Sequence, residues 1–407
     1  MEFEKPKNKI LDELWPVLVI LRCLGKIPIT KKNGESSYNW RSFHFLYSVI
    51  LTTIYLIVWI MTIANAGFRT TWFHFILRPS TATADSILAS SSSVISLIAK
   101  SYFIVQPFSY IVDFTLPWIN LPQNLEILNR WSEFQSYFEN GICDHEFYPL
   151  EFSLRRSRTR FIIWATVPSA LGIIIFTGEQ LAWDPIVNTF IGTCLALSMT
   201  FVSFMEDVML NLHYKAVEQS FHLIRNRVRD FPNDDVTSNI ARGWTNLVLL
   251  LREQNKRICK SKATHQLVWT FLAIILLTMY IFLVMQCLTS ELGPETTTIA
   301  AVCFLYSFIN FARIYCKCVA AEKLTNAEKL LAQDLIPKIV VCDNLLTKSE
   351  LQFLHDVIIN QPTTVTYGGI TFNRGFLLSM ISHIITYLVI LIQFNVNQIV
   401  DEKSRSG

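Results

Sequence analysis

The polar residues that could do chemistry gather in the last long apolar segment of the chain, residues 376–400. This segment has no charged residue, but polar residues recur in it at spacings of three, four, seven and four: Ser379, Ser382, Thr386, Gln393 and Asn397. On a helix with about 100° per residue, these positions fall within roughly 60° of one another. A polar stripe facing lipid is costly, so this one must face protein or water. It predicts either hydrogen bonds between helices or one wall of an aqueous pore that several subunits enclose.

The same segment carries apolar residues that could close such a pore. Ile390 interrupts the polar stripe and Phe394 flanks it, beside Gln393. Because an apolar constriction can gate a pore by dewetting, we expect these three residues at a narrow gate. Asp401 and Glu402 follow the segment directly. In a ring of subunits their carboxylates would favour cations at the mouth; in a single chain they would be a solvated terminus.

A second polar group is predicted where two other apolar segments end. Glu206 and Asp207 close one segment, and Arg313 closes another that runs in the same direction. Buried charges in a membrane need partners of opposite charge. We therefore expect Arg313 to pair with Glu206 or Asp207, unless all three side chains extend to the membrane surface.

The remaining residues give no basis for an enzyme. The chain has no phosphate-binding loop, nucleophile elbow or paired-histidine metal motif, and its eight histidines are scattered. Its nine cysteines suggest no disulfide framework. Cys316 and Cys318 lack a second cysteine or histidine pair nearby, so we expect no zinc site. No cofactor is predicted.

The elements that must position these residues are predicted to be membrane helices. Apolar residues make up 51% of the 407 residues and charged residues only 16%, against roughly a quarter in soluble proteins. The mean hydropathy is +0.35, and the net charge of +3 gives no reason to expect nucleic acid. Seven segments are long enough for a spanning helix: 43–68, 86–105, 161–178, 185–205, 266–290, 296–312 and 375–400. A shorter apolar run, Leu14 to Leu21, predicts an interfacial helix.

The placement of basic residues predicts the orientation. With a cytoplasmic N-terminus, the inside segments 1–42, 106–159, 206–265 and 314–373 hold 27 of the 35 Lys and Arg residues, and the outside segments hold four. Since Lys and Arg concentrate in cytoplasmic loops, the N-terminus is predicted inside and the C-terminus outside.

The C-terminal helix also carries a family resemblance. Thr386-Tyr387-Leu388-Val389-Ile390-Leu391-Ile392-Gln393-Phe394 resembles the signature of the insect gustatory receptor family, at the expected position in the last span. Two further segments are similar to that family, Leu21 to Pro28 and Thr366 to Arg374, although Tyr367 and the run from Ile370 to Phe372 depart from its common form.

The resemblance implies a fold and an assembly. The chain would be an all-α integral membrane protein with seven transmembrane helices, a cytoplasmic N-terminus and an extracellular C-terminus, assembled as a homo- or hetero-tetrameric, poorly selective cation channel. Thr386 and Tyr387 would pack or orient the pore helix, Gln393 and Phe394 would lie at the gate, and Gly368-Gly369 would be a flexible elbow. An amphipathic helix at 345–360 would join subunits. The implied regions are a cytoplasmic N-terminal segment 1–42, spans 1–6 over 43–312 with cytoplasmic extensions at 106–160 and 206–265, a cytoplasmic anchor 313–373, the pore-lining span 374–400 and an extracellular tail 401–407.

The resemblance also implies a pocket for a small-molecule tastant among the outer halves of spans 1–6. The polar and aromatic residues predicted there are Ser86, Ser90, Glu179, Gln180, Trp183, Asn188, Tyr280, Gln286 and Tyr306. Leu388 stands where sugar receptors tend to have an acidic residue, which favours a bitter compound or a sugar such as fructose. The expected location is the plasma membrane of gustatory neurons, and the other expected partners are permeant cations and membrane lipid.

Two other classes of protein stay open as alternatives. A seven-span G-protein-coupled receptor would need an external N-terminus, which the basic residues disfavour. A secondary transporter would place polar residues at breaks in its helices near the bilayer midplane, whereas here they lie on one unbroken helix.

Overall fold

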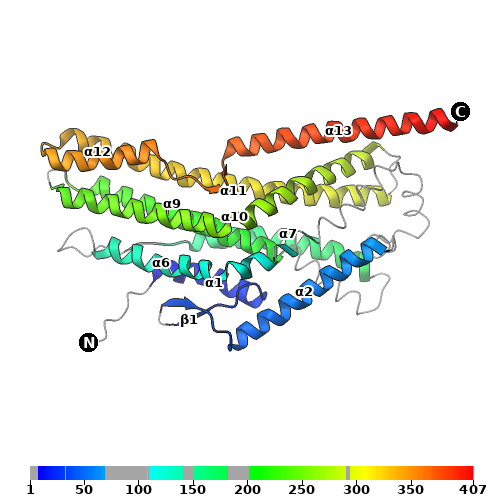
Figure 1. Ribbon diagram of the computed structural model, residues 1–407, viewed down its shortest axis with the longest axis horizontal. Helices are drawn as coiled ribbons and strands as arrows, with labels where there is room; N and C mark the ends of the chain where they lie inside the picture. The colour runs from blue at the N-terminus through cyan, green and yellow to red at the C-terminus, as the bar shows by residue number, and fades with distance from the viewer. Residues whose placement is uncertain are drawn as a thin grey trace.

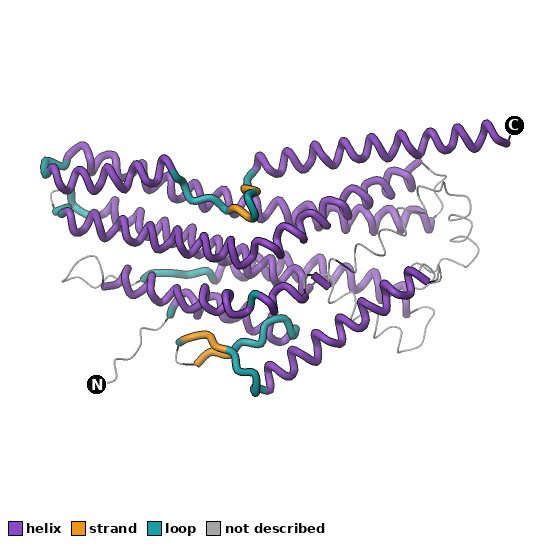
Figure 2. The backbone as a smooth tube through the Cα atoms, viewed as in Figure 1, coloured by secondary structure: helices purple, strands orange, loops and turns teal. Residues whose placement is uncertain are grey.

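The computed structural model describes residues 8–32, 34–68, 108, 111–112, 114–140, 150–181, 201–233, 235–289 and 294–406. These residues form a long helical bundle with two small hairpins (Figures 1 and 2). The helices are α1 Lys9–Cys23, α2 Phe43–Phe68, α6 Leu121–Asn140, α7 Arg155–Leu181, α9 Ser203–Asp230, α10 Ser238–Thr289, α11 Pro294–Val341, α12 Leu345–Asn360 and α13 Arg374–Ser406. The strands are β1 Thr30–Lys32, β2 Glu35–Ser37, β3 Thr366–Tyr367 and β4 Ile370–Thr371. The prediction of an all-helical fold is confirmed, and only the hairpins were missed.

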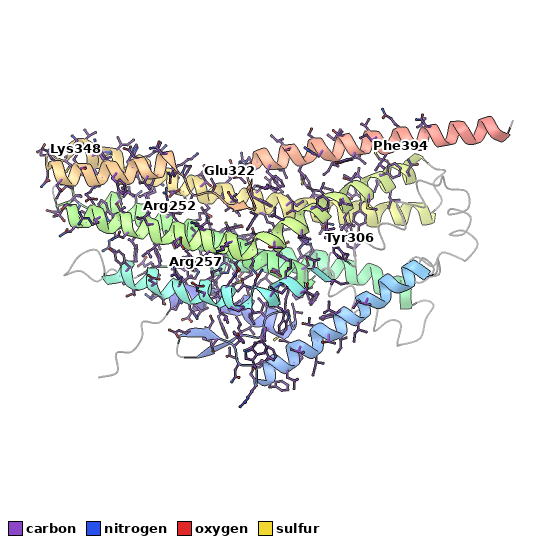
Figure 3. All side chains as sticks on the ribbon, in the orientation of Figure 1. Arg252, Arg257, Tyr306, Glu322, Lys348 and Phe394 are labelled. Carbon is purple, nitrogen blue, oxygen red and sulfur yellow. The ribbon has the colours of Figure 1, made fainter. Side chains whose placement is uncertain are left out.

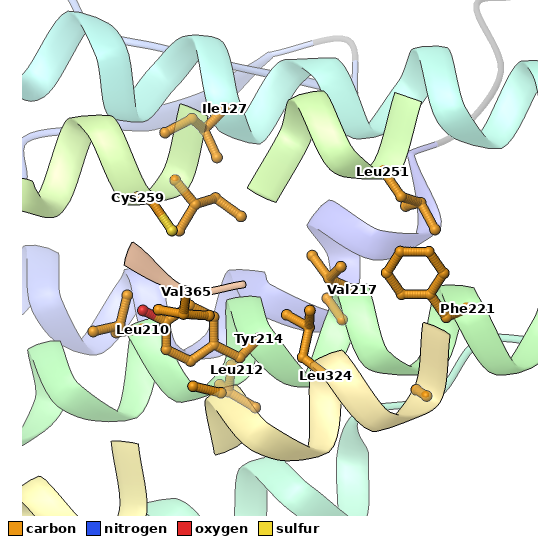
Figure 4. Packing of buried hydrophobic residues seen from close by; sticks show 14 of the residues in the cluster. Ile127, Leu210, Leu212, Tyr214, Val217, Phe221, Leu251, Cys259, Leu324 and Val365 are labelled. Carbon is orange, nitrogen blue, oxygen red and sulfur yellow. The ribbon is translucent and has the colours of Figure 1, made fainter. Parts of the chain in front are cut away.

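The centre of the bundle is built by α9, α10 and α11, which pack along one another for much of their length. Figure 4 shows part of this core, where Phe221 of α9 lies beside Leu251 of α10 and Val217 of α9 lies beside Leu324 of α11. All four side chains are buried. The three helices keep packing far beyond the predicted spans, because each carries an apolar face into the segments predicted to be cytoplasmic.

The N-terminal helix α1 lies against α6 and α9. Asn8 caps it by accepting a hydrogen bond from the Leu11 N–H at 2.9 Å. The apolar side chains of α1, including Leu14 and Leu21, are fully buried in the bundle. The expectation of an interfacial helix is wrong for this surface, because other helices cover the apolar face that was assigned to lipid.

The hairpin β3–β4 connects α12 to α13. Its two central residues, Gly368 and Gly369, have φ angles of +53° and +90°. Positive φ at both central positions is the geometry of a type I′ turn, which suits the twist of two antiparallel strands. The expected flexible elbow is thus a defined hairpin, and Tyr367 within it is buried.

Five of the seven predicted spans fall on described helices: α2, α7, the C-terminal part of α10, the N-terminal part of α11 and α13. Two helices within the described ranges are long and apolar enough to cross a membrane, over Ser238–Gln286 and Arg374–Phe394, and Phe43–Ile57 is a shorter apolar helix. The span at 86–105 and most of the span at 185–205 lie outside the described residues. The number of spans and their orientation therefore stay predictions.

Candidate functional site

The last helix, α13, has two different faces. Its inner face packs on α10 and α11. Leu377, Met380 and Ile384 are buried there, and Leu388 and Leu391 pack against Met279 and Phe282 of α10. At about 100° per residue, this face points nearly opposite the direction of the polar stripe.

The predicted polar stripe lies on the other face of α13, away from the helices of its own subunit. All five of its side chains are exposed: Ser379, Ser382, Thr386, Gln393 and Asn397. The Thr386 hydroxyl donates to the Ser382 carbonyl oxygen at 2.9 Å, a common way for a helical threonine to satisfy its own hydroxyl. The stripe therefore has no role in packing within the described part of one chain.

The predicted gate residues are exposed on this free surface as well. Phe394 is 60% exposed and Ile390 is 40% exposed, and Gln393 is exposed beside them. Figure 3 labels Phe394 on the C-terminal half of α13. Tyr387, expected to pack or orient the helix, is also mainly exposed. Large apolar side chains on a free surface indicate contact with lipid or another subunit.

The base of α13 is held firmly. Asn373 caps the helix by accepting from the Phe376 N–H at 2.8 Å. Arg374 forms an ion pair with Glu322 of α11 at 2.8 Å, and the rings of Phe372 and Phe376 stack with centroids 4.8 Å apart. The hairpin thus fixes where α13 starts relative to α11.

The predicted inner-face charges lie together in a buried cluster, the inner charge cluster: Glu206, Asp207, Lys26, Lys262, Arg313 and Lys317. Arg313 Nε lies 2.5 Å from Asp207 Oδ2, and Lys317 Nζ lies 2.6 Å from Asp207 Oδ1. Arg313 and Lys317 also lie over the ring of Trp269, at 4.1 and 3.7 Å from its centroid. Asp207 therefore holds two cations that share one aromatic face.

Glu206 does not pair with Arg313 and has other partners. Its carboxylate lies 2.6 Å from Lys26 Nζ and 3.1 Å from Lys262 Nζ. These two contacts join the N-terminal segment and α10 to α9, so the cluster ties together four separate parts of the chain. Burial, and then the charge of Lys262, lowers the pKa of nearby His213 to about 3.

Sequence reasoning missed three members of the inner charge cluster. Lys317 stands four residues after Arg313, on the same helical face, and that spacing was a usable signal. Lys26 and Lys262 are far from Glu206 in sequence, and nothing in their spacing indicates that they meet it.

The residues predicted for the outer pocket are only partly described. Tyr280 of α10 and Tyr306 of α11 lie side by side, with ring centroids 5.8 Å apart and planes at 10°. Tyr280 is buried, and Gln286 is half-buried on the same helix as Tyr280. Glu179 and Gln180 lie on α7. The others fall outside the described residues: Ser86, Ser90, Trp183 and Asn188.

The amphipathic segment 345–360 forms α12. Leu351, Leu354 and Ile358 are buried against the bundle, whereas Leu345 and Phe353 are exposed large apolar residues. The helix packs on α10 and α11 with one face and leaves apolar side chains free on another.

Among the described residues, no group of three or more His, Cys, Asp or Glu side chains is arranged to hold a metal ion. Burial raises the pKa of the Cys318 thiol to about 12, which keeps it protonated at neutral pH. Cys318 thus has the environment of a packed apolar side chain.

The fold and these surfaces define a helical bundle with long apolar helices, and comparison with known proteins gives its family. The family model described as 7tm chemosensory receptor matches residues 14–398. The chain belongs to this family, which makes it a receptor and not an enzyme.

The chain is also similar in fold to the insect olfactory receptor OR5 from Machilis hrabei. The structure of that receptor in complex with eugenol has a TM-score of 0.68 and 15% identity, over 95% of this chain and 99% of that one. A second structure of OR5 has a TM-score of 0.68 and 14% identity, over 94% of this chain and 98% of that one. No protein with a curated description matches the sequence.

Proposed function

We propose that the protein is a gustatory receptor that acts as a tastant-gated, non-selective cation channel. The observation that carries this proposal is the orientation of α13. Its apolar face is buried on α10 and α11, and its polar stripe points away from the subunit. Polar side chains in a membrane need water or protein opposite them, and a pore shared between subunits supplies water.

The proposed pore is formed by four copies of α13, contributed by identical or related chains. Each stripe then faces the central axis, with Ile390, Gln393 and Phe394 forming the gate and Asn397 nearer the external mouth. Asp401 and Glu402 of each copy would form an acidic ring there, which favours cations. The free apolar side chains of α12, such as Leu345 and Phe353, fit a contact between subunits in the cytoplasmic anchor.

The proposed ligand is a small-molecule tastant, either a bitter compound or a sugar such as fructose. The stacked pair of Tyr280 and Tyr306 supports a site between α10 and α11, because aromatic faces pack against sugar rings and planar molecules alike. Family membership fits a multi-pass protein of the plasma membrane. We propose gustatory neurons as its location, with the N-terminus in the cytoplasm.

The pore assignment is tested by cysteine accessibility in cells that express the receptor. Gln393→Cys and Asn397→Cys should give currents that a charged, membrane-impermeant thiol reagent blocks. Ile385→Cys is the matched control, since Ile385 is also exposed on α13 but about 90° from the stripe. Equal block of all three variants, or block of Ile385→Cys alone, would remove α13 from the pore wall.

The gate assignment needs its own variants. Gln393→Ala and Phe394→Ala should change single-channel conductance or the ligand concentration for half-maximal opening, whereas Ile385→Ala should change neither. Unchanged conductance and gating in both gate variants would contradict the assignment. Calcium imaging with sugars and bitter compounds then identifies the ligand class.

A further inference from the structure

A groove opens between α7, α9 and α11, and neither α13 nor the stacked tyrosines contribute to its lining. Its volume is about 430 Å³, within the roughly 300–1,000 Å³ of small-molecule sites. The walls are mainly apolar, with Phe161 and Trp164 from α7, Val208 from α9, and Leu305 and Phe308 from α11.

The polar residues of the groove all lie toward one end. Asp207, Asn211 and Arg313 line it, Asn211 and Arg313 toward the C-terminal side of the lining residues on α9 and α11. α7 begins near the same end because it runs in the opposite direction. Asp207 and Arg313 neutralise each other at 2.5 Å. The other end, near Val167 and Leu305, has only apolar lining residues. This polarity suits a molecule with an apolar body and a polar head.

The rim of the groove has the composition of a membrane boundary. Trp164 is 54% exposed and Val167 is 52% exposed on α7, and Phe308 is 55% exposed on α11. Exposed apolar side chains in this density favour contact with acyl chains, and tryptophan is enriched at the level of the lipid headgroups.

Two arginines stand beyond the polar end of the groove. Arg156 and Arg160 are exposed on the first turns of α7. With about 100° per residue they share a helical face with Ile163, Trp164 and Val167. Neither arginine has an acidic partner among the described residues.

We propose that this groove binds one acyl chain of an anionic phospholipid, with the headgroup phosphate at Arg156 and Arg160. The acyl chain enters between Trp164 and Phe308 and lies along the apolar wall. Arginine is suited to phosphate because its planar guanidinium donates two parallel hydrogen bonds. The orientation derived from the basic residues places this lipid in the cytoplasmic leaflet.

The site differs from the proposed tastant pocket. Its polar end contains the ion pair of Asp207 and Arg313, which belongs to the inner charge cluster. A bound lipid would thus lie against the elements that the cluster holds together.

The test uses the full-length receptor in nanodiscs that contain a trace of phospholipid with a photoreactive diazirine in its acyl chain. The probe has either a phosphatidylserine or a phosphatidylcholine headgroup, and labelled peptides are mapped by mass spectrometry. We expect labelling of α7 and α11 at the groove, several-fold stronger with phosphatidylserine. Both leaflets of the nanodisc have the same composition and no current is measured, so the result is independent of orientation and of channel function.

Three variants locate the binding. The double change Arg156→Gln and Arg160→Gln should lower groove labelling by phosphatidylserine at least fivefold, since each basic residue near an anionic headgroup contributes on the order of fivefold in affinity. Arg155→Gln is the matched control, because Arg155 is also exposed but points about 120° away from the groove face. Ala312→Phe fills the groove from α11 and should remove labelling by both probes.

The labelling pattern of the unmodified receptor decides the proposal even if a variant fails to fold. Equal groove labelling by the two probes would overturn the anionic headgroup, and absence of labelling at α7 and α11 would overturn the site. Displacement of the probe by an uncharged tastant, without any effect of headgroup charge, would show that the groove takes a tastant and not a lipid.

Discussion

The buried ion pairs of Asp207 predict an unequal response to removal of its partners. Asp207→Asn removes the carboxylate that Arg313 and Lys317 both contact, in a site where these three side chains are at most 7% exposed. Arg313→Met leaves Asp207 paired with Lys317. We therefore expect Asp207→Asn to be the more destabilising change.

The magnitude follows from the burial of these charges. Breaking a buried ion pair by removing one partner costs about 3–5 kcal/mol, mainly because the remaining charge stays uncompensated. With an unfolding entropy of about 2.1 cal/mol/K per residue, a chain of 407 residues loses roughly 1 °C of melting temperature for each kcal/mol. Asp207→Asn should thus lower the Tm by about 3–5 °C, and Arg313→Met by less.

The assay is the thermal loss of the intact receptor peak in size-exclusion chromatography of detergent-solubilised protein. Glu350→Gln is the matched control, because it breaks the ion pair between Glu350 of α12 and Arg242 of α10. The Arg242 side chain in this pair is 58% exposed. Exposed ion pairs contribute little to stability because solvent screens them, so its Tm should change by no more than about 1 °C.

A combined variant tests whether uncompensated charge is the cause. Adding Arg313→Met and Lys317→Met to Asp207→Asn removes both cations together with the acid, and part of the lost Tm should return. A Tm for Asp207→Asn equal to that of the Glu350→Gln control would refute the reasoning, as would a combined variant less stable than Asp207→Asn alone.

Three further predictions concern single side chains. Burial lowers the pKa of His213 to about 3 from its ordinary 6.5, so between these pH values only the unfolded chain binds the proton. The free energy of unfolding should therefore decrease as the pH is lowered from 6.5 toward 3, by up to about 1.4 kcal/mol per pH unit. The decrease should be smaller in His213→Gln. A Cβ on Gly368 would lie 2.4 Å from Leu267 Cδ1 of α10, whereas one on Gly369 would meet nothing within 4 Å. Gly368→Ala should therefore lower surface expression more than Gly369→Ala. The Gly369 variant has only the cost of its positive φ, about 1–2 kcal/mol. Burial raises the pKa of the Cys259 thiol to about 11, so iodoacetamide at pH 8 should label exposed Cys23 and leave Cys259 unlabelled until the protein unfolds.

The sequence predicted the features that depend on local periodicity. The helical period placed the polar stripe on one face of α13, and the amphipathic pattern over 345–360 coincides with α12. Both depend only on spacing along one helix, which the sequence states directly.

Features that depend on contacts between distant segments were not predictable. The sequence pattern of α1 predicts an apolar face but not whether lipid or protein covers it. Its packing on α6 and α9 decides between the two. In the same way, Glu206 has two basic partners that lie 180 residues before it and 56 residues after it. The paired glycines at 368 and 369 carried a hairpin signal, but the strands beside them have only two residues each.

The length of α10 has a mechanical consequence. This helix runs unbroken for 52 residues, about 78 Å at 1.5 Å per residue, and contains no proline. If the whole helix tilts as one body, a rotation of about 5° around one end displaces the other end by up to roughly 7 Å. The hairpin that starts α13 packs on this helix between the two ends, where Asn255 donates to the Thr364 carbonyl oxygen and Leu267 lies beside Gly368. A small closure around the tyrosines near one end of α10 would therefore reach the start of α13 along one continuous helix.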